Sequence, residues 1–183
     1  MGASNEANFN KQKQAAIEVV KPEKNSDVIY EVIRYGKGAA VEKSLAVKMD
    51  KKALVTFLYS LPWQEPGEAL LAGVRQAQLS FERHGRPKAR KILVVFSDNR
   101  LNESSPVVEK TGGDLRRTEI KIIGILVGKN GEEDKITTLA GKKPLKIDET
   151  NEPKETGKQI AEEILKGWRL MKDKNFSSLE VFL

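Results

Sequence analysis

Five consecutive apolar residues, Ile92 to Phe96, form the segment around which the rest of the hydrophobic pattern is arranged. The run is too short for a buried helix and has no polar alternation, so it predicts a strand that is covered on both faces. Ser97, Asp98 and Asn99 follow it directly. Because open α/β sheets bind ligands at the carboxyl ends of their strands, this order predicts that the Asp98 carboxylate lies at the functional rim of a sheet.

Helical and strand periodicities alternate along the rest of the chain. Apolar spacing predicts helices over 8–20, 51–61, 68–84, 106–117, 132–139 and 155–172, and strands over 27–35, 40–47, 119–128, 145–147 and 178–183. Gly36 to Gly38 form a turn between the first two strands, which predicts a hairpin and therefore one antiparallel edge. The alternation predicts an α/β fold, a doubly wound and mostly parallel sheet with helices on both faces.

The composition fits one soluble globular domain. The chain has 183 residues, 39% hydrophobic and 32% charged, which is enough to bury a core. No apolar run reaches the length of a membrane-spanning helix. Cysteine is absent, which excludes disulfides, thiolate metal sites and thiol catalysis.

Basic residues gather in one loop between a predicted helix and the central strand. Lys and Arg exceed Asp and Glu by 32 − 26 = 6, and six basic side chains lie close together at Arg83, His84, Arg86, Lys88, Arg90 and Lys91. Such a cluster could contact phosphates of a nucleic acid or another polyanion. The ordinary interpretation is a solvated loop, and the lack of interleaved aromatic residues argues against base stacking.

The motifs of common enzyme classes are missing. Neither a P-loop, a dinucleotide-binding fingerprint nor a nucleophile elbow follows any predicted strand. His84 is the only histidine and lies between arginines in a loop, where an exposed structural role is expected. We therefore expect a protein without enzymatic activity.

The order of elements resembles the von Willebrand factor A (VWA) domain family over nearly the whole chain. The family's strand ending in T-D-G, and its later strand of the type F-A-I-G-V-G, are similar to Ile92–Asn99 and Ile120–Gly128. The N-F pair that commonly begins the family's first helix resembles Asn8-Phe9. The family's hairpin is similar to Val28–Val47, and its T-N-T-G-x-A-L loop to Gln64–Leu70.

The resemblance implies adhesion through a metal-ion-dependent adhesion site. In the family, D-x-S-x-S after the first strand, a Thr of the T-N-T-G loop and the Asp of T-D-G hold Mg²⁺ or Mn²⁺, and an acidic residue of the partner protein completes the coordination. Asp98 matches the last of these. Gln64 stands at the Thr position, and D-x-S-x-S falls within 2–6, where the leading Asp is missing.

The resemblance therefore implies a degenerate metal site with a ligand-binding rim around it. Its metal ligands would be Ser4, Glu6 in place of the last Ser, and Asp98, and its rim residues would be Asn5, Gln64, Glu65 and Asn99. An equally good interpretation of Asp98 is a carboxylate that backbone N–H groups satisfy at a strand end. The implied partner is a protein, including components of the extracellular matrix, and the resemblance favours an extracellular setting.

The position of the family's first strand is unusual. That strand should precede D-x-S-x-S, yet the strand-like segment similar to it is Leu179–Leu183. We therefore expect a single VWA-like domain over 1–183 in which 176–183 replace the first strand in the central slot, a circular permutation. If Met1 is a cut within a larger protein, the last strand could belong to a neighbouring domain. The same strand could also fill the slot of another copy, and such exchange would build filaments.

Overall fold

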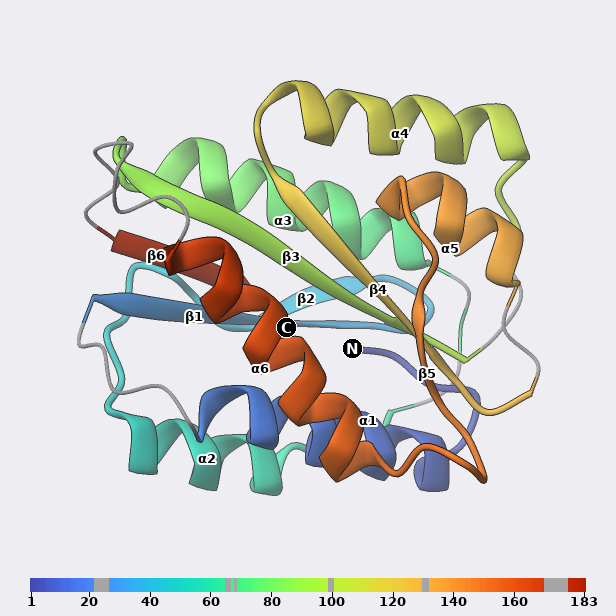
Figure 1. Cartoon of the computed structure of the whole chain (residues 1–183), viewed down its shortest axis with the longest axis horizontal. Coiled ribbons are helices and arrows are strands. Elements are labelled where there is room, and N and C mark those ends of the chain that lie inside the picture. The colour runs from blue at the N-terminus through green and yellow to red at the C-terminus, as the bar shows by residue number, and fades with distance from the viewer. Residues whose placement is uncertain (22–26, 65–66, 68, 99–100, 130–131, 170–177) are drawn as a thin grey trace.

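The computed structural model describes residues 1–21, 27–64, 67, 69–98, 101–129, 132–169 and 178–183. Helices and strands alternate along it (Figure 1). The helices are α1 (Glu6–Val20), α2 (Lys51–Ser60), α3 (Leu70–His84), α4 (Ser105–Arg117), α5 (Glu133–Ala140) and α6 (Pro153–Arg169). The strands are β1 (Val28–Tyr35), β2 (Ala39–Lys43), β3 (Ala89–Ser97), β4 (Lys121–Val127), β5 (Leu145–Ile147) and β6 (Ser178–Phe182).

The strands form one six-stranded sheet in the order β2-β1-β6-β3-β4-β5. Only the β1–β2 pair is antiparallel, and the pairs that β6 makes with β1 and β3 are parallel, as are β3–β4 and β4–β5. This confirms the predicted α/β class with its antiparallel edge hairpin.

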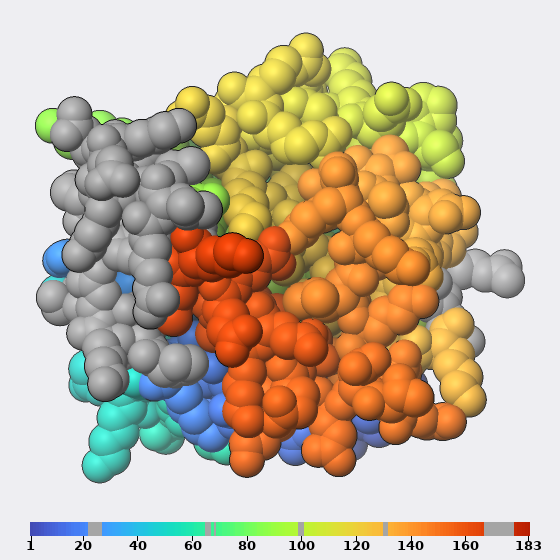
Figure 2. All heavy atoms as spheres, in the orientation of Figure 1, coloured from blue at the N-terminus to red at the C-terminus, as the bar shows by residue number. Residues whose placement is uncertain are grey.

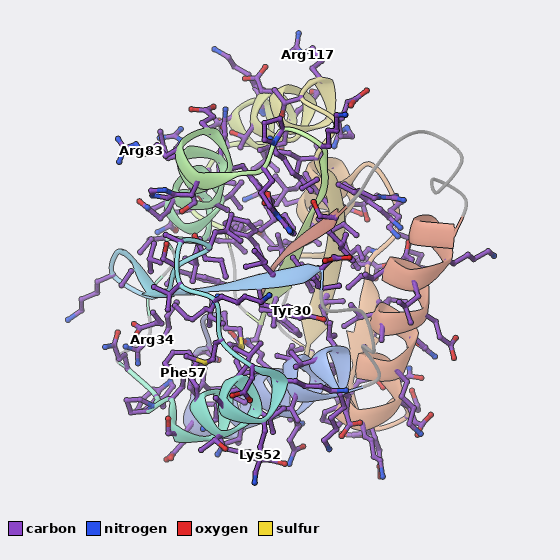
Figure 3. All side chains as sticks on the ribbon, turned by 90° about the vertical axis from the view of Figure 1, so that its left-hand side faces the viewer. Tyr30, Arg34, Lys52, Phe57, Arg83 and Arg117 are labelled. Atoms are coloured by element: carbon purple, nitrogen blue, oxygen red, sulfur yellow. The ribbon has the colours of Figure 1, made fainter. Side chains whose placement is uncertain are left out.

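Helices cover both faces of the sheet, which Figure 3 shows nearly edge-on. Alternate residues of β3 face opposite ways, since side chains of a strand alternate with period two. Ile92, Val94 and Phe96 are buried in a core with residues of α1, α2 and α6, whereas Leu93 and Val95 join a second core with α3, α4 and α5. The prediction of a strand buried on both faces is confirmed.

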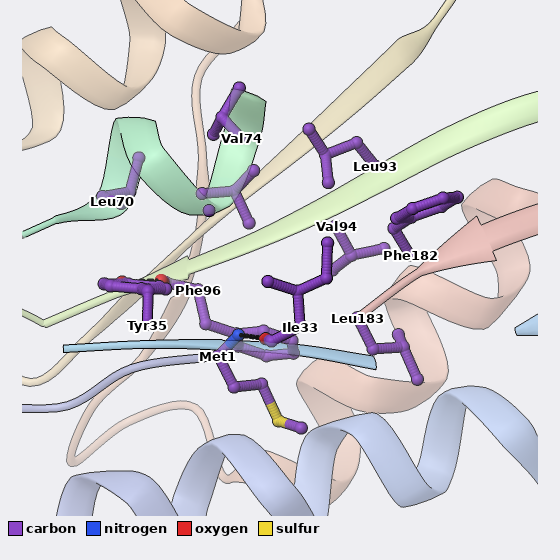
Figure 4. Close-up of a pocket in the computed structure, with 12 residues that line it drawn as sticks. Met1, Ile33, Tyr35, Leu70, Val74, Leu93, Val94, Phe96, Phe182 and Leu183 are labelled. Carbon is purple, nitrogen blue, oxygen red and sulfur yellow. Dashed lines mark hydrogen bonds between the residues drawn. The ribbon is translucent and has the colours of Figure 1, made fainter. Parts of the chain in front are cut away.

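The C-terminal strand β6 lies in the middle of the sheet, and the N-terminal segment continues its line. The Leu183 N–H donates to the Glu31 carbonyl (3.0 Å), and the Ile33 N–H donates to the Leu183 carbonyl (3.1 Å). At the next step along β1, the Met1 nitrogen donates to the Ile33 carbonyl, and Tyr35 N–H donates to the Met1 carbonyl (2.9 Å). Met1 thus takes the ladder position two residues beyond Leu183, and Figure 4 shows the two ends meeting there.

The predicted strand over 40–47 is too long, because β2 ends at Lys43. The Leu45 N–H donates to the buried Glu31 carboxylate (2.8 Å) instead of a strand neighbour. Val47 N–H then closes a turn onto the Ser44 carbonyl (3.1 Å). The predicted extension of the last helix to 172 lies outside the described residues. In the part of the chain that the structure describes, no helix is long and apolar enough to cross a membrane.

Candidate functional site

Asp98 stands at the carboxyl end of β3 and is almost fully buried, with 2% of its surface exposed. The Ser4 N–H lies 2.9 Å from both of its carboxylate oxygens. The Ser4 hydroxyl donates to Oδ2 (2.7 Å), and Asn8 Nδ2 donates to the same atom (2.8 Å). Three donor groups of the chain therefore satisfy this buried carboxylate.

The start of α1 brings these donors to Asp98. Asn5 is the N-cap residue, with an extended backbone, and its side chain accepts from the Asn8 N–H (2.9 Å). Asn8 lies one turn after Ser4, so both side chains share the helix end that faces β3. Because the N-terminus of a helix carries partial positive charge, it also favours a carboxylate at this position.

Tyr35 leaves no room for a side chain on Gly2, the position that the resemblance predicts for the family's first metal-ligating Asp. A Cβ built on Gly2 would lie 2.3 Å from the Tyr35 carbonyl oxygen and 2.7 Å from its ring. The buried Gln12 side chain holds Gly2 in place, because its Oε1 accepts from the Gly2 N–H (3.0 Å) and its Nε2 donates to the Gly2 carbonyl (2.7 Å).

The phenol of Tyr35 reaches the same strand end as Asp98. Its hydroxyl donates to the Phe96 carbonyl oxygen. Burial raises the pKa of the Tyr35 phenol, and the neighbouring Asp98 carboxylate raises it further. The phenol is therefore a fixed, neutral hydrogen-bond donor at this edge of the sheet.

Three side chains fix the loop that follows α2. Lys13 Nζ donates to the Leu61 carbonyl (2.9 Å), Arg34 Nη1 to the Pro62 carbonyl (2.6 Å), and Trp63 Nε1 to the Ala3 carbonyl (3.3 Å). Farther along, a Cβ on Gly67 would lie 2.0 Å from the Gly36 backbone. Gly67 therefore packs directly on the β1–β2 turn, and glycine is required at the contact.

The structure brings together Ser4 and Asp98 of the predicted site. Asn5 is exposed beside them as a helix cap, while Glu6 is exposed in the first turn of α1. Gln64 is exposed in the loop after α2. Among the described interactions, none joins Glu6 or Gln64 to Asp98. Glu65 and Asn99 lie outside the described residues, and the binding roles of all these residues remain predictions.

Sequence reasoning missed two parts of the site. Asn8 was interpreted only as part of a helix start, although its spacing of four residues from Ser4 places both at one helix end. The contact of Tyr35 with Gly2 joins segments far apart in sequence, so no local signal could have identified it.

The donor set present does not fit a divalent cation. Mg²⁺ and Mn²⁺ require several oxygen ligands, normally including carboxylates. Gly2 offers no side chain, and N–H and O–H donors already point at the Asp98 oxygens. Within the described ranges, no group of three or more His, Cys, Asp or Glu residues could hold a metal ion.

The match to a family model decides which family the chain belongs to. The model of the von Willebrand factor type A domain matches residues 2–160. The chain belongs to the VWA domain family. The resemblance noted from the sequence is thereby confirmed, and family membership supports a module for protein interaction or adhesion in general terms. No curated protein matches the chain.

Solved structures with the same fold come from distant sources. Proximal thread matrix protein 1 from the mussel byssus superposes with a TM-score of 0.75 at 18% identity, over 86% of this chain and 43% of that one. The chain thus spans less than half of that protein. BatB from Bacteroides thetaiotaomicron gives 0.72 at 15% identity over 88% of both chains, and the SpRpn10 VWA domain gives 0.62 at 16% over 82% of both. Another structure of the byssus protein has zinc in its adhesion-site motif.

Proposed function

We propose that this VWA domain is a non-enzymatic binding module whose rim contacts a partner protein without a divalent cation. The rim consists of the predicted residues Asn5, Gln64, Glu65 and Asn99, and to these we add Glu6, which the resemblance implied as a metal ligand. Family membership supports a protein partner. The hydrogen bonds to Asp98 support binding without a cation. Three donors already compensate the buried carboxylate, so a bound metal ion is not required to stabilise its charge.

The described rim residues Asn5, Glu6 and Gln64 suit recognition because they are exposed and stand on a rigid support. Asn5 and Glu6 begin a helix that is held to β3 through Asp98. Gln64 follows a loop held by hydrogen bonds from α1, β1 and Trp63. A rigid polar surface loses little conformational entropy on binding, which favours affinity.

The test is partner capture from the native source with wild-type protein and an Asn5→Ser/Gln64→Ala variant. Serine keeps the helix cap. A Lys48→Ala/Lys52→Ala variant, altered at exposed positions in and just before α2, serves as the control. We expect a protein partner that wild type and control bind equally in Mg²⁺ and in EDTA, and that the rim variant loses. Capture that needs Mg²⁺, or that is the same for both variants, would contradict the proposal.

The alternative is a polyanion or nucleic-acid contact through the basic loop Arg83–Lys91. Figure 3 shows Arg83 pointing away from the molecule, and Lys88 is exposed. Arg86, however, donates to the buried Glu180 carboxylate (3.1 Å) and to two backbone carbonyls. Lys91 lies 5.7 Å from the Phe81 ring centre. These two cations already have structural partners, so the basic-loop alternative has less support. Steep salt dependence of partner capture would favour that alternative.

Self-association by strand exchange is a second proposal, and the central position of β6 supports it. Removing β6 would leave β1 and β3 with unpaired backbone groups, so a strand from another copy could fill the same slot. The pair Ala89 and Ser178 lies in register, and the chain has no cysteine. Oxidised Ala89→Cys/Ser178→Cys protein should yield covalent multimers if copies exchange strands. If oxidation at high protein concentration gave intramolecular disulfides alone, strand exchange would be excluded. The permuted single domain would then remain.

A further inference from the structure

Three cations and one carboxylate gather at the opposite end of the sheet from the rim, on the face that α6 covers. Arg90 and Lys121 begin neighbouring parallel strands, and Lys121 is paired with Ile92. Side chains alternate along a strand, so Arg90 and Lys121 share the face on which Ile92 and Ile123 are buried. Lys142 follows the glycine that ends α5, and Glu163 comes from α6.

The charges in this cluster do not balance. Glu163 Oε1 lies 3.2 Å from Lys121 Nζ and also pairs with Lys142. Arg90 has no ion pair in the described part of the chain, and its Nη1 is buried there without a hydrogen-bond partner. Three cations against one carboxylate leave a formal charge of +2. A buried guanidinium N–H without an acceptor is costly, so the cluster favours an incoming acceptor.

The pKa values of Lys121 and Lys142 also favour an incoming anion. Burial lowers the pKa of Lys121, and repulsion from Arg90 lowers it further. Burial also lowers the pKa of Lys142, to about 8, with a further contribution from Lys121. The three cations thus destabilise one another, and a bound anion would relieve that repulsion. In Figure 2 the chain after α5 and the helix α6 lie side by side at the surface. The side chains of Lys121 and Lys142 are 27% and 37% exposed, so an ion from solvent can reach them.

We propose that Arg90, Lys121 and Lys142 form a binding site for a tetrahedral oxyanion, a phosphate or sulfate group either free or carried as an ester. The planar guanidinium of Arg90 suits two oxygens of such a group, and the lysines supply point charges to the others. Glu163 is the internal competitor for both lysines. This site is separate from the rim and does not depend on the function proposed for it.

The test is a titration of the ¹⁵N-labelled 183-residue chain with inorganic phosphate, and separately with sulfate, at constant ionic strength. We expect saturable shifts at the amides of Arg90, Lys121 and Lys142, and calorimetric affinity in the millimolar range or tighter. Arg90→Gln should weaken binding by about tenfold, as expected for loss of a charge-assisted contact. Lys52→Gln, an exposed control in α2, should bind like wild type.

Glu163→Gln distinguishes a binding site from a structural ion pair. Removing the competing carboxylate should tighten phosphate binding, whereas a purely structural role predicts no gain. Lys142→Gln provides a second loss variant if Arg90→Gln fails to fold. Comparison of phenyl phosphate with phenyl sulfate identifies the preferred ester. Unsaturable shifts spread over all lysines, or unchanged affinity in both loss variants, would overturn the proposal.

Discussion

The Tyr35 ring occupies the space that any side chain on Gly2 would need. This contact connects β1 with the segment that leads into α1, directly beside Asp98. It gives a physical reason for glycine at position 2, because an aspartate there would overlap both the ring and the Tyr35 carbonyl. Packing around Gly2 and hydrogen bonds to Asp98 thus fill the end of β3 where the resemblance predicts a metal ion.

Substitution at Gly2 should therefore lower the free energy of unfolding, and the size of the loss should depend on the Tyr35 ring. We expect Gly2→Ala to lower the free energy of unfolding by about 1–3 kcal/mol through overpacking. Combining Gly2→Ala with Tyr35→Ala should cost less than the sum of the single variants, while Tyr35→Phe, which keeps the ring, should give no relief. Urea denaturation of the three single variants and of the two double variants with Gly2→Ala measures this coupling. Strict additivity in the cycle would mean that the Tyr35 carbonyl, which Tyr35→Ala leaves in place, causes the whole cost of Gly2→Ala, and would contradict the role given to the ring.

Asn8 should contribute to stability through the buried Asp98 carboxylate. Asn8→Ala removes one of its donors, and we expect a loss of about 1–3 kcal/mol. Asn10→Ala, an exposed position in the same helix, controls for helix propensity. Chemical denaturation again provides the measurement. Equal losses in the two alanine variants would argue that the hydrogen bond from Asn8 to Asp98 is unimportant.

The fold could be predicted from sequence to a large extent because its signals are local. The apolar run at Ile92–Phe96 and the alternation of periods specify the central strand and the sheet class. The position of Asp98 follows from the strand end alone. The early end of β2 could not be predicted, because Glu31 captures the Leu45 N–H from another strand. Side-chain packing between distant segments has no periodic signature.

The same limit applies to the site. The helix cap Asn5 lies near its partner in sequence, and its position before an amphipathic pattern is a known helix-start signal. The exclusion of a side chain at Gly2 depends on how β1 lies beside the N-terminal segment, which only tertiary structure reveals.

β6 should behave as a core strand. Phe182 is fully buried, and its ring centre lies 3.9 Å from that of Phe81 in α3. Phe182→Ala should cost about 3–5 kcal/mol, whereas Val107→Ala, at an exposed position of α4, should change stability by less than about 0.5 kcal/mol. Thermal and urea unfolding measure both. A mild effect at Phe182 would mean that β6 adds little to the sheet.

Stability should rise with pH on the alkaline side because of Lys43. This side chain is 6% exposed and donates to the Tyr30 and Ser44 carbonyls. Burial lowers its pKa to about 8, although Glu31 partly offsets this. Between that value and the ordinary pKa of lysine, the unfolded state binds more protons than the folded state, so raising the pH favours folding.

The change should be on the order of 1 kcal/mol per pH unit above about pH 8. Urea unfolding as a function of pH measures it, with Lys43→Met as the comparison. The variant should show a flatter profile in this range. A wild-type profile that is flat or falling there, or parallel to that of the variant, would contradict the assignment to Lys43.

The central claim is that the rim binds no divalent cation. Its most direct test is a titration with Mg²⁺ and Mn²⁺ at fixed ionic strength. The measured quantities are the melting temperature and the amide resonances of Ser4, Gln64 and Asp98. The saturated Asp98 carboxylate and the side-chain-free Gly2 predict no saturable shift and no change in melting temperature. A saturable response confined to those three residues would show that the rim binds a cation after all, and would contradict the account.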